Sequence, residues 1–215
     1  MPIAPGAAAC AMLAFLATAA PAAPVQLAYD ALAPVTIEDF ESYAPGPLAS
    51  PATFTGFAFD AAAPLITAST TLCRTGGTCL TDNDLLANAP RVFSGFDAAV
   101  TGFGLRLSWV NPAQIATLAV TVTGGSGSGT FAGFASGALT TALAFGDAAG
   151  LTSVTLRIAD LSGPGGAFLT NYGADDVITA TGPLSPVPLP APGAALALAL
   201  ALAALSRPGR RAPAP

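Results

Sequence analysis

The sequence predicts an all-β protein, an antiparallel β-sandwich, from three observations. Short stretches of alternating apolar and polar residues recur between residues 33 and 181 and are bounded by Gly, Pro, Asn and Asp. This period-two pattern is typical of strands with one buried face. Glycine (23 residues) and proline (20 residues) interrupt the chain often, which favours short strands and turns over long helices. Both ends of the 215-residue chain are apolar and poor in charge, so we expect one core in its middle.

The first element, residues 1–22, is expected to be a secretory signal peptide. The stretch from Ala7 to Ala20 is apolar and uncharged, and Ala-x-Ala patterns at 17–19 and 20–22 have the spacing that signal peptidases recognise. We expect cleavage between Ala19 and Ala23. The alternative is a membrane anchor, but the run is shorter than the roughly 18 to 20 residues of a membrane span.

Residues 23–182 form the predicted sandwich domain. In its longest strand pattern Phe103, Leu107 and Trp109 share one parity and the polar residues share the other, so one face and Trp109 should be in the core. A jelly-roll or galactose-binding-like sandwich fits best. The Gly/Ser segment 124–129 should be a flexible hairpin loop, with an interdomain linker as the alternative. The clearest strand patterns are Val35–Phe40, Phe54–Phe59, Arg91–Phe96, Val100–Val110, Leu118–Thr123, Thr141–Phe145, Val154–Ala159 and Asp176–Thr181.

Charge and composition exclude several functions. The chain has 7 basic and 12 acidic residues, a formal net charge of -5, and three of its arginines lie near the last residue. Such an acidic domain is unsuited to following phosphates, so we expect no nucleic acid partner. Lysine and histidine are absent from the sequence, which removes Ser-His, Cys-His and His-ligated zinc sites.

Two cysteines indicate an oxidising compartment. Cys73 and Cys79 flank Arg-Thr-Gly-Gly-Thr, whose glycines can turn the chain and bring the sulfurs together. We expect a disulfide-closed hairpin, stabilising by roughly 2 kcal/mol. The alternative is a pair of free thiols.

Carboxylates near the two ends of the domain are candidate metal ligands. First and last strands of sandwiches often lie close together, and a cluster of acids there would favour a hard cation such as Ca²⁺. The sequence therefore leaves a structural calcium site open, with separate solvated acids as the alternative. Because Glu38 and Glu41 point to opposite faces of a strand, although Asp39 and Glu41 share one, we expect no glycosidase and no other enzyme. The candidate ligands are Glu38, Asp39, Glu41, Asp175 and Asp176.

Tyrosines in predicted turns are candidate sugar platforms. Tyr43 lies before Ala-Pro-Gly, and Tyr172 lies between Asn171 and Gly173. Aromatic rings beside polar groups are what carbohydrate binding requires. The alternative is that each ring packs on the edge of the sandwich.

A Pro-rich linker at 183–193, an expected hydrophobic helix at 194–206 and a basic tail at 207–215 follow the domain. The apolar run would cover only about 18 to 20 Å as a helix, against a hydrocarbon core of about 30 Å, so it is a marginal span. Arginines after it favour the cytoplasmic side. The linker holds Val187, Pro188, Leu189, Pro190 and Ala191, and the tail holds Arg207, Arg210 and Arg211.

This tail resembles the VPLPA-type C-terminal sorting domain of the PEP-CTERM group, which exosortases process in Gram-negative bacteria. The resemblance covers about residues 186–211 and is carried by Val187 to Ala191. It implies that these five residues are recognised, that the apolar run anchors the chain temporarily and that the arginines retain it. Two departures are Pro208-Gly209 within the basic cluster and the Ala-Pro-Ala-Pro extension. The alternative is a Pro-rich linker with a plain hydrophobic anchor.

The sandwich also resembles, loosely, domains carried by PEP-CTERM proteins, in the pairing of an early strand (35–41) with a late one (173–177). Together these features predict a non-enzymatic protein exported through the inner membrane to the cell envelope, surface or extracellular matrix. Its partners would be an exosortase-type enzyme and, before processing, the membrane. A carbohydrate-binding module for exopolysaccharide, with or without calcium, is the alternative function.

Overall fold

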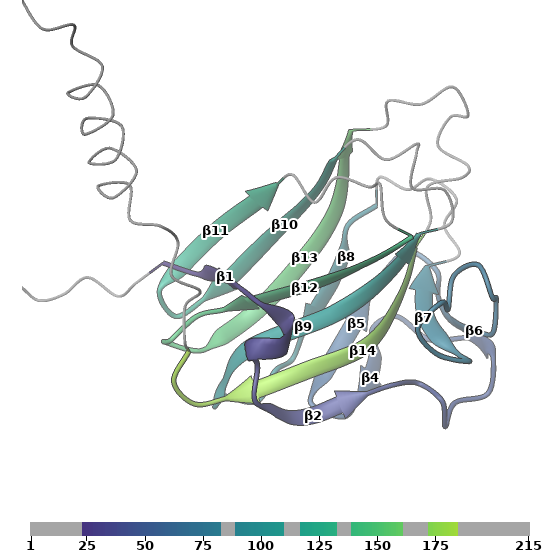
Figure 1. Cartoon of the computed structure of the whole chain (residues 1–215), viewed down its shortest axis with the longest axis horizontal. Coiled ribbons are helices and arrows are strands. Elements are labelled where there is room, and N and C mark those ends of the chain that lie inside the picture. Colours follow the sequence, from purple (N-terminus) through teal and green to yellow (C-terminus); the bar gives the residue numbers. More distant parts are fainter. Residues whose placement is uncertain (1–22, 83–88, 110–116, 133–138, 161–171, 185–215) are drawn as a thin grey trace, which may run out of the picture.

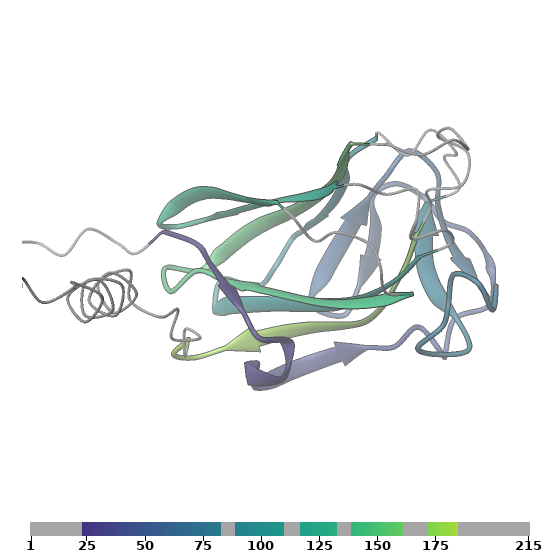
Figure 2. The same ribbon diagram turned by 45° about the horizontal axis from the view of Figure 1, so that its top comes forward.

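The computed structural model describes residues 23–82, 89–109, 117–132, 139–160 and 172–184. These residues form two antiparallel sheets facing one another, so the predicted all-β sandwich architecture is confirmed (Figures 1 and 2). In the described chain one sheet has eight strands: β1 Val25–Leu27, β2 Pro34–Glu38, β3 Gly46–Pro47, β6 Pro64–Thr67, β7 Cys79–Asp82, β9 Val100–Trp109, β12 Thr140–Gly146 and β14 Tyr172–Thr181. The other has six: β4 Ala52–Phe54, β5 Phe57–Asp60, β8 Arg91–Ser94, β10 Thr117–Gly124, β11 Gly127–Ala132 and β13 Leu151–Asp160.

Strand β14 holds the eight-stranded sheet together, although it is the last strand described. It pairs with β9 along one side, and with β7 and then β2 along the other. Glu38 lies opposite Val177, so the early and late strands that the sequence paired are indeed neighbours.

The main core lies between the sheets. Phe59 and Phe93 of the six-stranded sheet have ring centroids 5.0 Å apart, and Phe93 is 5.1 Å from Phe103 of β9. Aromatic contacts of this kind link both layers across the core. Trp109 is completely buried, as the parity of its strand predicted.

A second apolar cluster covers the outer face of the eight-stranded sheet. Ile178 and Ala180 point outward because Val177, of the opposite parity, is in the main core. The segment of β1 and the short 3-10 helix η1 (Tyr29–Ala31) crosses this face and packs Leu27 and Leu32 on it. Side-chain atoms of Leu32 fill the space over Gly102 and Gly104, where an added Cβ would lie 2.8 Å from them.

Two segments differ in detail from the prediction. The stretch 54–59 is not one strand, because Gly56, at φ +84°, turns the chain between β4 and β5. The Gly/Ser segment 124–129 is a hairpin as predicted, but β10 and β11 run through it and leave only Gly125 and Ser126 in the turn. The sequence also missed β1, β3, β6, β7 and β11, most of which are short.

Candidate functional site

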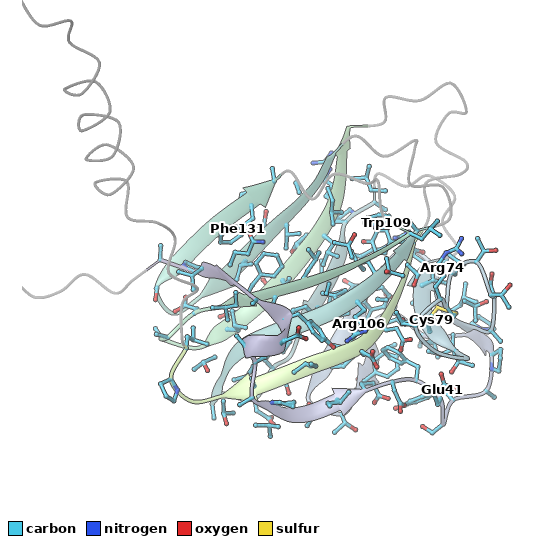
Figure 3. All side chains as sticks on the ribbon, in the orientation of Figure 1. Glu41, Arg74, Cys79, Arg106, Trp109 and Phe131 are labelled. Carbon is cyan, nitrogen blue, oxygen red and sulfur yellow. A yellow bond between two sulfur atoms is a disulfide. The ribbon has the colours of Figure 1, made fainter. Side chains whose placement is uncertain are left out.

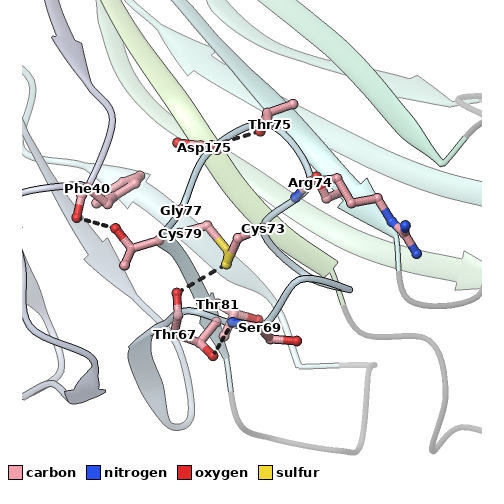
Figure 4. The surroundings of a disulfide bond; sticks show 12 residues. Phe40, Thr67, Ser69, Cys73, Arg74, Thr75, Gly77, Cys79, Thr81 and Asp175 are labelled. Atoms are coloured by element: carbon pink, nitrogen blue, oxygen red, sulfur yellow. Dashed lines mark hydrogen bonds between the residues drawn. A yellow bond between two sulfur atoms is a disulfide. The ribbon is translucent and has the colours of Figure 1, made fainter.

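The disulfide loop, residues 73–79, lies at one end of the sandwich (Figure 3), and its surroundings are drawn in Figure 4. Cys73 and Cys79 are disulfide-bonded with Cα atoms 5.3 Å apart, and both residues are buried. The predicted disulfide is therefore confirmed. The hairpin, however, is formed by β6 and β7, and Cys73 lies in the connection between them. Figure 3 shows Glu41, Arg74 and Cys79 grouped at this end, away from Phe131.

Carboxylates from distant parts of the chain hold this loop. Glu41 accepts hydrogen bonds from the backbone N–H groups of Gly77 and Thr78, the second at 3.1 Å. Asp175 accepts one from the Thr75 hydroxyl at 2.7 Å. Both carboxylates close in on Gly76, where an added Cβ would lie 2.6 Å from Glu41 Oε1 and 2.7 Å from Asp175 Oδ2. Glu41 and Asp175, from early and late parts of the chain, thus approach the same glycine, with peptide groups of the loop between them.

Gly173 in β14 allows the disulfide loop to pack closely on this strand. An added Cβ there would overlap the Leu72 carbonyl oxygen and lie 2.6 Å from Cys79 Sγ. The loop continues over β9, where the Arg74 N–H donates to the Ser108 hydroxyl at 3.2 Å. Gly173 is therefore required by close approach, and a side chain at this position would displace the disulfide.

The other predicted ligands point elsewhere. Buried Glu38 accepts a hydrogen bond from the Phe40 N–H (3.3 Å) and from the Tyr43 hydroxyl (3.2 Å). Asp39 accepts one from the Glu41 N–H at 3.1 Å. Asp176 forms an ion pair with Arg106, with 3.3 Å between Oδ2 and Nε. The five acids therefore do not share one site: Glu41 and Asp175 hold the disulfide loop, and the other three have partners of their own.

Asp175 is the acid whose charge the fold disfavours. Burial raises its pKa above the ordinary value of 3.8, and the negative charges of Asp176 and Glu41 add to this effect. Hydrogen bonds from Thr75 and from the Asp176 N–H oppose it. A carboxylate in this setting is stabilised by any nearby positive charge.

Within the described residues, no group of three or more acidic or cysteine side chains is arranged to hold a metal ion. The calcium site stays a prediction. Its strongest remaining members are Glu41 and Asp175, since these two approach the same glycine.

The two tyrosines differ in their surroundings. Tyr172 was predicted in a turn, and this is wrong: it is the first residue of β14, is 3% exposed and packs edge-on against Trp109 at 5.2 Å. A buried ring cannot stack on a sugar. Tyr43 is half-buried, with its ring 5.5 Å from that of Phe54, so part of it remains open to solvent.

A buried ion pair behind Tyr172 was missed by the sequence analysis. Asp82 and Arg91, both almost fully buried, lie 3.6 Å apart (Oδ2 to Nε), and the Arg91 guanidinium sits 4.0 Å from the centre of the Tyr172 ring. The available signal was parity, because Arg91 and Phe93 occur on the same face of one strand.

The sorting motif Val187–Ala191, the apolar run 194–206 and Arg207, Arg210 and Arg211 lie outside the described residues, as does the predicted signal peptide 1–22. In the part of the chain that the structure does describe, no helix has the length and apolarity of a membrane span.

No protein-family model matches this chain, and no curated protein matches it. One solved structure that does match is the K2 cleaved adhesin domain of Lys-gingipain, with 17% sequence identity over 68% of this chain and 98% of that one. The TM-score is 0.44, which is too low to carry an inference.

Proposed function

We propose that this protein is a non-enzymatic component of the cell surface or extracellular matrix of a Gram-negative bacterium, exported by its leader and sorted by its VPLPA-type tail. The observation that carries the proposal is the order Val187 to Ala191, apolar run, arginines, directly after a folded domain. The Cys73–Cys79 disulfide supports it, since structural disulfides persist in oxidising compartments.

The contacts of the acids support the non-enzymatic part. Glu41 and Asp175 accept hydrogen bonds from the disulfide loop, and Glu38 accepts them from Phe40 and Tyr43. These carboxylates hold the fold, whereas general acid–base catalysis needs a pair directed at a substrate. We also propose that the sandwich is of the jelly-roll or galactose-binding-like type. The proposed surface function does not depend on this type.

Removing the prolines of the sorting motif tests the proposal. The double variant Pro188→Ala/Pro190→Ala should stay unprocessed and membrane-bound in its host, because the extended segment that an exosortase-type enzyme would recognise is lost. Mass spectrometry of the mature protein and fractionation measure this. The matched control is Pro213→Ala/Pro215→Ala, which removes two prolines outside the motif and should be processed normally. A motif variant of wild-type size and location would contradict the proposal.

Carbohydrate binding is the second candidate, favoured by one observation. Tyr43 is partly open to solvent and follows exposed Asp39 and Glu41 closely in the sequence, and a ring near polar groups suits a sugar. A glycan screen of the exported protein, with calcium and with chelator, tests it. Tyr43→Ala should abolish binding while Tyr43→Phe, which keeps the ring, should preserve it. Equal binding by both variants would contradict a stacking role.

A further inference from the structure

The sorting motif follows the folded domain very closely. Leu184 packs on the outer-face cluster, where its Cδ1 would lie 2.6 Å from a Cβ added to Gly146. Just before it, the Thr101 hydroxyl donates to the Gly182 carbonyl at 2.9 Å. The chain is therefore fixed to the sheet up to Leu184, and only Ser185 and Pro186 separate that residue from Val187.

This spacing limits how far the motif can stand from the domain. Three extended residues span at most about 10 Å, so Val187 begins within about 10 Å of Leu184. Ten residues lead from Leu184 to Ala194, where the apolar run starts, and they reach at most about 35 Å. A domain of this length is itself about 35 to 40 Å across.

Apart from Asp97, the surface around Leu184 is uncharged and made mainly of small residues. We call it the Leu184 end: the turns 97–99, 125–126 and 147–150, and residues 182–184. These turns contact one another, since the Gly125 N–H donates to the Gly150 carbonyl and the Asp147 N–H donates to the Thr101 carbonyl, both at 2.9 Å. Asp147 is buried, which leaves Asp97 as the exposed charge. The other exposed residues include Ala98, Ala99, Ala148, Ala149, Gly125 and Gly182.

The opposite end of the sandwich differs in charge. It displays Asp39, Glu41 and Arg74 around the disulfide loop. Figure 1 shows β14 running from the disulfide end, at the right, to the Leu184 end at the left, where the β10–β11 and β12–β13 turns also lie. A small-residue surface allows close approach of another protein, because it carries little charge to desolvate and no long side chains to order.

We propose that the Leu184 end is the surface that contacts the membrane-embedded processing enzyme while the tail is inserted, and that docked Leu184 sets the distance. This inference rests on the proposed sorting function. The disulfide loop then points away from the membrane.

Charged substitutions on the two ends test this contact. Ala98→Glu/Ala148→Glu and Ala98→Arg/Ala148→Arg place bulky charges on the Leu184 end, and Ala44→Glu/Ala68→Glu is the matched control at the disulfide end. All four positions are exposed, so each variant should fold normally, as thermal unfolding will show. Both Leu184-end variants should be processed about tenfold more slowly in pulse-chase labelling, equivalent to about 1.4 kcal/mol in activation free energy, and the control should match the wild type.

A spacer tests whether the slow processing depends on the closeness of the domain to the enzyme. Six Gly/Ser residues inserted between Leu184 and Ser185 should restore normal processing to both slow variants, because the enzyme no longer needs to meet the domain. Wild-type rates in the charged variants, or slow processing that the spacer does not correct, would overturn the contact. Slowing by glutamate but not by arginine would overturn it in favour of repulsion from an anionic lipid surface. An unprocessed wild type would overturn the proposed function together with this inference, whereas the other outcomes leave the function intact.

Discussion

The disulfide loop and the β10–β11 turn lie at opposite ends of the sandwich, and both are held by carboxylates that accept hydrogen bonds from glycine-rich backbone. At the first, Glu41 and Asp175 hold a loop that a covalent bond also closes. At the second, Asp147 alone accepts from the Ser126 N–H (3.0 Å), the Ser126 hydroxyl and the Ala149 N–H (2.8 Å). A turn held by the side chain of one carboxylate should depend on that residue more than a loop that a covalent bond also restrains.

The largest expected effect is therefore at the uncrosslinked end. Asp147→Ala should lower the free energy of unfolding by about 3 kcal/mol, because several donors around a fully buried acceptor lose their partner at once. Chemical denaturation measures this. Asp97→Ala, an exposed acid in the neighbouring turn, is the control and should change stability by less than about 0.5 kcal/mol. An equal loss in both variants would remove the special role of Asp147.

Removing the disulfide should have a smaller effect. Cys73→Ser/Cys79→Ser should cost about 2 kcal/mol, the chain-entropy value for so short a loop. The remaining hydrogen bonds from Glu41 and Asp175 should keep the loop near its seat. Reductant should lower the Tm of the wild type toward that of the double variant and leave the variant unchanged. A loss greater than that of Asp147→Ala would reverse the comparison between the two ends.

The smallest effect concerns the charge of Asp175 and depends on pH. Its folded pKa is raised above 3.8, so as pH rises the unfolded chain releases this proton first and the folded state is disfavoured. The stabilising contribution of the protonated form is complete below about pH 3.8 and is lost as pH rises through the folded pKa. Asp175→Asn should thus be more stable than the wild type at pH 7, and the gain should vanish in acid.

Denaturant titrations of the variant and the wild type at several pH values check this. A calcium-dependent loss of the gain at pH 7 would indicate that a cation offsets the charge of Asp175. An Asn variant less stable than wild type at pH 7 would show that the ionised carboxylate is favoured after all.

The sequence was informative where the position of a residue follows from the pattern of its near neighbours in the chain. The alternation through β9 placed Trp109 in the core, and the spacing of Cys73 and Cys79 predicted their bond. Tyr172 was misplaced because Asn171 and Gly173 resemble a turn, whereas Gly173 is needed for the disulfide loop that packs on it. That contact joins segments about a hundred residues apart, and alternation within one strand carries no information about it.

The candidate site, like the fold, could be predicted from the sequence only in part. The neighbouring early and late strands bring Glu41 and Asp175 toward Gly76, whereas Glu38, Asp39 and Asp176 have other partners. What lies between Glu41 and Asp175 depends on how the loop 73–79 is seated, which is a matter of three-dimensional packing. Short strands such as β3 and β7 were missed because two to four residues are too few to establish a period.

The pairing of β2 with β14 has a consequence for how the chain reaches its native state. Thr36 and Thr179, whose hydroxyls are hydrogen-bonded, are 143 residues apart in the sequence. The eight-stranded sheet cannot close until nearly the whole domain has been synthesised, and contacts of such separation make folding slow. The eight-stranded sheet of a growing chain therefore stays incomplete until β14 has been made, and an incompletely folded chain is the form that a narrow translocation channel can accept.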